Sequence, residues 1–165
     1  MRSKKDEMLG QEFNTNTCGK CVIVKYNNAK DVVVKFYDPV CFVKCAVSSL
    51  RDGEVKNKLH LSFYNKGFIG VGDYSFKDRK VFQIWNAMLK RAYCIKHLKT
   101  HASYKGVEVC DEWLNFQNFA EWWEENVYNC NNERMHLDKD ILCKGNKIYS
   151  PETCVLVPQR INQLF

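Results

Sequence analysis

The chain closes with the stretch "MHLDKDILCKGNKIYSPETCVLVPQRINQLF", residues 135–165, whose pattern predicts two strands followed by a helix. Residues 135–142 have the alternation of a first strand, and the Gly-Asn-Lys of residues 145–147 favours a turn. Residues 154–157 are apolar enough for a second strand. Pro158 suits the first turn of a helix, because its fixed φ is already helical. We therefore expect a ββα finger at residues 135–165.

Polar residues on the first predicted strand supply candidate chemistry. Side chains two residues apart point to the same face of a strand, so His136, Asp138 and Asp140 share one face. Carboxylate oxygens are ligands for Mg²⁺ or Mn²⁺, and such an ion can stabilise the leaving oxygen of a phosphodiester. A ββα finger of this kind performs metal-dependent phosphodiester hydrolysis when a nearby base activates water.

The N-terminal third predicts a small antiparallel sheet. Residues 21–26 and 31–36 are β-branched and aromatic runs separated by a four-residue turn, and residues 40–47 form a third run. We expect residues 1–10 to be a flexible N-terminus because they are mostly charged, and residues 11–60 to form a small β module.

Residues 61–165 are expected to hold a helical region and the finger. Apolar residues recur at helical spacing over 78–97, with Asp78 as a candidate N-cap, and a second helix is predicted to begin near Asn115 or Asn118. Spaced glycines among apolar residues at 67–72 predict a loop that bends tightly or approaches another part of the chain closely. The predicted fold class is α+β.

The charge distribution suggests a polyanionic partner. The net charge is +6, and residues 54–105 carry 11 Lys and Arg against 3 Asp and Glu, whereas residues 106–165 carry 5 against 10. A basic block favours DNA, bound mainly through phosphates, although a solvated lysine-rich surface has the same composition. The candidate DNA-binding residues are Lys77, Arg79, Lys80, Lys90, Arg91, Lys96 and Lys99.

Nine cysteines cannot all pair within one chain, and no secretory signal is recognisable, so we expect reduced thiols and an intracellular protein with no membrane span. Two cysteine pairs, Cys18 with Cys21 and Cys41 with Cys45, are separated by 19 residues. This spacing is close to that of a structural zinc site, but buried thiols on one face of a sheet explain it equally well. Both interpretations stay open.

Three long motifs resemble those of a phage-encoded family of HNH, or homing-endonuclease-like, proteins of the His-Me finger type. They are "FQIWNAMLKRAY" (82–93), "VCDEWLNFQNFAEWW" (109–123) and "LDKDILCKGNKIYSPETCVLVPQRIN" (137–162), in this order. The N-terminal "GQEFNTNTCGKCVIVKYNNAKDVVVKF" is similar to the β module of the same family. The resemblance implies an HNH-like finger, a DNA endonuclease and the cytoplasm of an infected bacterium. Many members continue into an ethylene-response-factor-like DNA-binding module that this sequence lacks.

Transferred residue by residue, the resemblance implies a departure from the usual active site. Asp138 matches the metal-binding aspartate, but Lys139 occupies the position of the histidine base. Lysine is a poor base at neutral pH unless it is strongly desolvated, and His136 can replace it only if the register shifts. The loop asparagine corresponds to Asn146 or is replaced at Glu152-Thr153. The candidate catalytic residues are His136 and Lys139, and the candidate metal ligands are Asp138, Asp140 and Asn162.

Four functions are therefore open. The finger is a working metal nuclease, a DNA-binding finger with altered catalysis, or a structural element. A different class is a non-enzymatic phage protein that regulates DNA or inhibits a host or defence protein.

Overall fold

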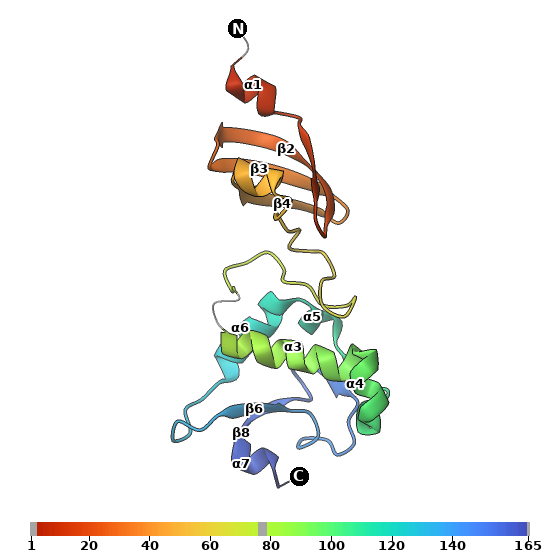
Figure 1. Cartoon of the computed structure of the whole chain (residues 1–165). Coiled ribbons are helices and arrows are strands. Elements are labelled where there is room, and N and C mark those ends of the chain that lie inside the picture. Colours follow the sequence, from red (N-terminus) through yellow and green to blue (C-terminus); the bar gives the residue numbers. More distant parts are fainter. Residues whose placement is uncertain (1–2, 76–78, 165) are drawn as a thin grey trace. The chain divides into compact units, whose positions relative to one another are not determined.

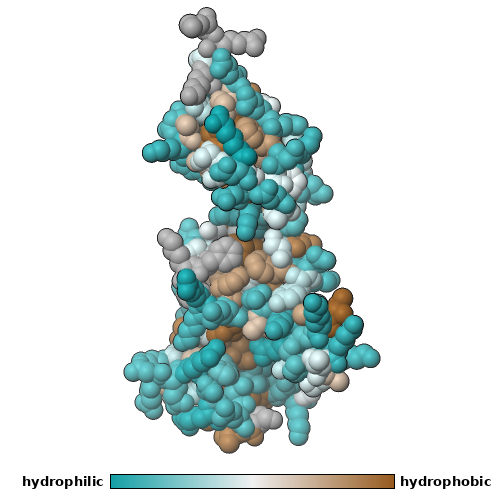
Figure 2. Space-filling model, viewed as in Figure 1, coloured by the Kyte–Doolittle hydropathy of each residue, from teal (hydrophilic) through white to brown (hydrophobic). Residues whose placement is uncertain are grey.

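The computed structural model describes residues 3–75 and 79–164, and it divides the chain into two compact units. The N-terminal unit is Met1–His60 and the C-terminal unit is Leu61–Phe165. Antiparallel strands dominate the first, and helices with two small sheets make up the second (Figure 1). The structure thus confirms the α+β class. The surface visible in Figure 2 is mostly hydrophilic, with separate apolar patches.

The N-terminal unit is a four-stranded meander with a short helix at each end. Helix α1 (Lys4–Met8) precedes strands β1 (Glu12–Thr15), β2 (Gly19–Asn28), β3 (Asp31–Tyr37) and β4 (Val40–Cys45), and helix α2 (Val47–Arg51) follows. Strand order is β1-β2-β3-β4, every pair antiparallel, with a bulge at Val24. One face of the sheet forms the core through fully buried residues such as Ile23, Val34 and Phe36.

Helix α1 lies in the stretch that the sequence predicts to be flexible. Ser3 accepts a hydrogen bond from the Asp6 backbone N–H, and the Asp6 carboxylate accepts one from the Ser3 backbone. This reciprocal pair satisfies two of the free N–H groups at the helix start. Met8 at the other end is buried in the sheet core, which anchors the helix.

The C-terminal unit is built around an aromatic core. Helix α3 (Arg79–Tyr93) crosses the middle of this unit, with α5 (Asp111–Leu114) and α6 (Phe116–Asn126) on one side and β6 (Met135–Asp138) and β8 (Val155–Pro158) on the other (Figure 1). Its buried stripe repeats at helical spacing: Val81, Trp85, Met88, Leu89 and Ala92. Trp85 donates a 2.7 Å hydrogen bond to the Trp113 carbonyl, so the buried indole N–H is satisfied.

The helix predicted for residues 78–97 is divided in two. Helix α3 ends at Tyr93, Cys94 has extended backbone, and α4 (Ile95–Thr100) continues in a new direction before a 3₁₀ turn, η1 (Ala102–Tyr104). The predicted N-cap Asp78 lies outside the described residues. Helix α6 begins after Asn115, whose side chain accepts a hydrogen bond from the Gln117 N–H. Of the two predicted starts, the structure has the one at Asn115.

The glycine loop packs against α3 and α6. A Cβ on Gly67 would lie 3.0 Å from the Trp85 ring, and one on Gly70 would lie 2.9 Å from Gln117 Cγ. The Gln117 amide donates to the Ile69 and Tyr74 carbonyls and accepts from the Tyr74 N–H, which ties the loop to α6. The expected close approach is therefore to the core of the unit.

We expect Gly70→Ala to lower the free energy of unfolding by about 2–3 kcal/mol. Gly70 has a φ of +77°, and an added methyl would collide with the Asn115 amide that caps α6. Gly106→Ala is the matched control, because Gly106 has a φ of +76° but open space around it and should lose only about 1 kcal/mol. Urea unfolding measures both, and equal losses would contradict the role of the Asn115 contact.

The chain end forms two short sheets and a final helix. Strands β6 and β8 pair antiparallel, with His136 opposite Val157, and α7 (Gln159–Asn162) follows β8 directly. Strand β7 (Ile148–Tyr149) pairs in parallel with β5 (Glu108–Val109). The strand predicted for 135–142 ends at Asp138, because the Asp138 carboxylate accepts the N–H groups of Asp140 and Ile141 and closes a turn. Asp140 therefore lies in the turn, and the prediction that it shares a strand face with Asp138 is wrong.

Candidate functional site

A cavity of about 230 Å³ lies in the C-terminal unit where α3, β6 and α7 meet. Residues four apart on α3 line one wall, and four consecutive residues, 134–137, line another. The polar lining residues are Gln83, Arg91, Arg134, His136 and Asn162. Two arginines, a histidine and two amides around one hollow are suited to bind an anion.

His136 is half-buried in this cavity and sits beside Asn162. The distance from His136 Nδ1 to Asn162 Nδ2 is 3.4 Å, so α7 returns its last residue to the first strand of the pair. His136 Nε2 and Asn162 Oδ1 are both buried, and neither has a hydrogen-bond partner among the residues that the structure describes. A buried polar atom without a hydrogen-bond partner costs about 1–3 kcal/mol of folding free energy. A ligand that forms hydrogen bonds with these two atoms would recover part of this cost and bind more tightly.

The surroundings of His136 favour its neutral imidazole form. Burial lowers its pKa below the ordinary value, and the positive charges of Arg134 and Arg91 lower it further. A neutral imidazole has a lone pair that can accept a proton. The same two arginines give the cavity a positive charge that suits an anion.

Stability should fall on acidification because the unfolded chain binds more protons than the folded one. The pKa values of His136 and His97 lie below the ordinary 6.5 in the fold, mainly through burial, so each histidine opposes folding as the pH drops through 6.5. Urea unfolding at several pH values between about 7.5 and 5 measures the loss. His136→Gln should flatten this pH dependence, and an unchanged dependence in the variant would contradict the burial of this imidazole.

Arg91 is held at the cavity by aromatic rings. Its guanidinium lies 5.6 Å from the centre of the Tyr149 ring and 6.0 Å from that of Tyr104, and its Nε donates to the Ala87 carbonyl at 3.3 Å. Burial raises the pKa of Tyr149, so its hydroxyl is protonated and the ring acts as a neutral platform. Cation–π contacts of this kind orient a guanidinium while its terminal N–H groups still point outward.

The Lys139 side chain is buried and fully hydrogen-bonded. Its side chain is 8% exposed, and Nζ donates to both Asp140 oxygens at 2.6 and 2.7 Å and to the Asn146 carbonyl at 2.8 Å. Asn146 in turn donates to the Lys139 carbonyl and bridges both backbone groups of Ile148. An ammonium with three acceptors has no lone pair for a proton. Of the two candidate bases, the geometry favours His136.

The predicted metal ligands have separate partners. Asp138 closes a turn, Asp140 pairs with Lys139, and Asn162 contacts His136. Within residues 3–75 and 79–164, no group of three or more His, Cys, Asp or Glu side chains is arranged to hold a metal ion. The described donors do not form an assembled ligand set, and the divalent ion stays a prediction.

The four cysteines considered for zinc lie in or beside the sheet core. Cys21 and Cys41 flank Phe36 on the buried face, and Cys18 is also buried. Burial raises the pKa of the Cys21 thiol, and that of Cys45 to about 11, which disfavours the thiolate that zinc requires. The placement favours buried thiols.

The predicted DNA-binding residues fall into three groups. Arg91 is half-buried in the cavity, whereas Arg79, Lys80, Lys90, Lys96 and Lys99 are exposed on α3 and α4. Lys80 borders a further cavity of about 380 Å³, and Met135 lines both hollows. Lys77 lies outside the described residues. Arg134 and Gln83 were missed, although Arg134 precedes His136 by two residues, a spacing that places both on one strand face.

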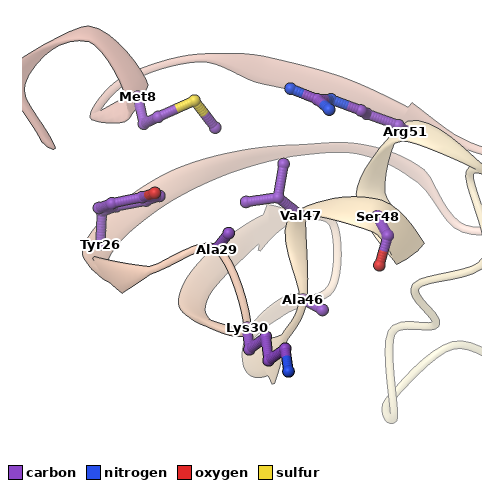
Figure 3. Close-up of a pocket in the computed structure, with 8 residues that line it drawn as sticks. All are labelled: Met8, Tyr26, Ala29, Lys30, Ala46, Val47, Ser48 and Arg51. Atoms are coloured by element: carbon purple, nitrogen blue, oxygen red, sulfur yellow. The ribbon is translucent and has the colours of Figure 1, made fainter. Parts of the chain in front are cut away.

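The N-terminal unit has a cavity of about 270 Å³ with a different character. Figure 3 shows Met8, Tyr26, Val47 and Arg51 converging on it, whereas the ends of Lys30 and Ser48 point away. Apolar surface dominates it, and it gathers no group of catalytic side chains.

None of the described helices is both long and apolar enough to cross a membrane. Comparison of the chain with known protein-family models, curated proteins and solved structures finds no match in any of the three.

Proposed function

We propose that the C-terminal unit binds DNA and positions one backbone phosphate in the cavity between α3, β6 and α7, where it can be hydrolysed. The observation that carries this proposal is the convergence of Arg91 and Arg134 on His136, whose Nε2 is buried without a partner among the described residues. Guanidinium groups bind phosphate oxygens through paired, charge-assisted hydrogen bonds. The exposed cations of α3 and α4 would add contacts to neighbouring phosphates.

In the proposed hydrolysis, His136 accepts one proton. The Nδ1–H form donates to Asn162 Oδ1 when the amide is turned so that its oxygen faces the ring, and this form leaves the Nε2 lone pair free. His136 Nε2 then takes a proton from water as the water oxygen attacks phosphorus, and a P–O bond of the backbone breaks. Arg91 and Arg134 stabilise the charge on the phosphate oxygens. A divalent ion, when bound, would stabilise the leaving oxygen.

A second candidate function is DNA binding without cleavage. The buried, fully hydrogen-bonded Lys139 at the position of the base and the use of Asp138 as a turn cap favour it. Both functions need the same phosphate contacts. They differ only in whether His136 transfers a proton.

A plasmid assay tests both functions. Supercoiled plasmid is incubated with the protein with and without Mg²⁺ or Mn²⁺, and binding to a duplex is measured by gel shift at several salt concentrations. Nicking that depends on the ion supports the nuclease. Binding that weakens steeply with salt but without nicking supports the non-cleaving function. If binding does not weaken with salt, the phosphate contacts are not made and a protein partner is favoured.

Two single variants, Arg134→Gln and Arg91→Gln, test whether the cavity binds phosphate. Glutamine removes the charge but keeps a polar side chain, and we expect the two variants to bind duplex DNA more weakly than Lys5→Gln, which alters a charge in the other unit.

A further inference from the structure

We propose that the outer face of the N-terminal sheet binds single-stranded DNA. The strand alternation that buries Val32, Val34 and Phe36 turns Val33, Lys35 and Tyr37 to the opposite face of β3. On β4 the same alternation buries Cys41 and exposes Val40 and Phe42. This face carries aromatic rings and lysines together.

Two aromatic residues stand on this face, on the adjacent strands β3 and β4. Tyr37 pairs with Val40 and Lys35 pairs with Phe42, so Tyr37 and Phe42 are diagonal cross-strand neighbours. Tyr37 is 46% exposed and Phe42 is 59% exposed, so both rings offer surface on which a base can stack. The Tyr37 hydroxyl donates to Glu12 at 2.8 Å, which holds that ring over β1 and β2 without covering it.

Lysines lie on the same face as the two rings. Lys35 on β3 lies between Val22 on β2 and Phe42 on β4, its partners on the two neighbouring strands. Lys44 on β4 is opposite Val33. Lys20 lies 3.6 Å from Glu12, which also accepts the hydrogen bond of the Tyr37 hydroxyl. Lys25 is opposite Val33 on the other neighbouring strand. The two acidic residues of this face, Glu12 and Asp31, are engaged by Lys20 and Lys44.

This combination fits a single strand better than a duplex or a protein. Bases in a duplex stack on one another, whereas those of a single strand can stack on exposed rings while lysines neutralise the phosphates. Protein interfaces are depleted in lysine, which shares this face with the two rings. The choice of DNA over RNA rests on the proposed function of the C-terminal unit, but the sheet face by itself selects a single strand.

Fluorescence anisotropy of the full-length protein with a labelled oligothymidine of about 12 nucleotides tests the proposal. Phe42→Ala should weaken binding by about 5- to 100-fold, because one stacked base is lost. Tyr128→Ala removes an exposed ring of the other unit and should bind like the original protein. Lys35→Gln should weaken binding and lower the salt dependence by about one phosphate contact.

Two further arms separate this proposal from the function of the other unit. Arg134→Gln should keep single-strand binding at the sheet while it weakens duplex binding, and Phe42→Ala should do the reverse. Unchanged single-strand affinity in both Phe42→Ala and Lys35→Gln overturns the proposal, whatever the outcome of the plasmid assay. Tighter binding of oligouridine than of oligothymidine overturns the choice of DNA. No binding of either strand overturns it in favour of a protein partner.

Discussion

Replacement of His136 by alanine is expected to slow plasmid nicking by about 100-fold or more, since a positioned base contributes about 10²–10⁴ to the rate. His136 is the candidate base whose lone pair can be free at neutral pH. Burial and the positive charges of Arg134 and Arg91 lower its pKa, the residue lines the cavity, and its Nε2 is buried without a partner among the described residues. The initial rate of conversion of supercoiled to open-circular plasmid measures the effect.

The pH profile gives a second measure of the same role. A base must be neutral to act, so the rate should rise with pH through the pKa of His136 and level off below the pH expected for an ordinary histidine. Asn162→Ala should lower the rate less than His136→Ala does, because Asn162 only orients the ring. A His136→Ala protein that still binds duplex DNA and nicks at the original rate would disprove the assignment of the base.

Much of the fold follows from local patterns in the sequence. The runs at 21–26, 31–36 and 40–47 correspond to β2, β3 and β4, because alternation and β-branching are enough to define strands with one buried face. The apolar stripe of α3 follows from helical spacing in the same way. These features depend on neighbours in sequence.

The site depends on residues that are distant in sequence, and here prediction was partial. The resemblance placed Asp138, Lys139 and Asn162 in one finger, but no local pattern shows that the Asp138 carboxylate closes a turn on its own chain. The burial of Lys139 requires the carbonyl of Asn146, seven residues later. Arg91 and His136 line the same cavity only because α3 and β6 both border it, an arrangement that periodicity does not specify.

Replacement of Lys139 by methionine is expected to lower the free energy of unfolding by about 3 kcal/mol. The substitution leaves the Asp140 carboxylate and the Asn146 carbonyl without their hydrogen-bond donor. Methionine fills a similar volume, but it cannot donate to Asp140 or to the Asn146 carbonyl. The Asp140 side chain is 45% exposed and regains water, which keeps the loss at the lower end of that for a buried pair. Urea unfolding of the full chain measures the change.

The same variant decides which residue is the base. Because Lys139 holds the loop of residues 139–146 together, Lys139→Met should melt at a lower temperature while it keeps most of its nicking rate at temperatures where it is folded. Lys139→Arg tests whether the positive charge alone is enough. The guanidinium keeps the charge, but it is larger than the ammonium group that this site encloses. Loss of nicking in a folded Lys139→Met protein, with full activity in His136→Ala, would instead assign proton transfer to Lys139. The two variants thus give opposite patterns of stability and rate for the two candidate bases, so the assignment does not depend on either measurement alone.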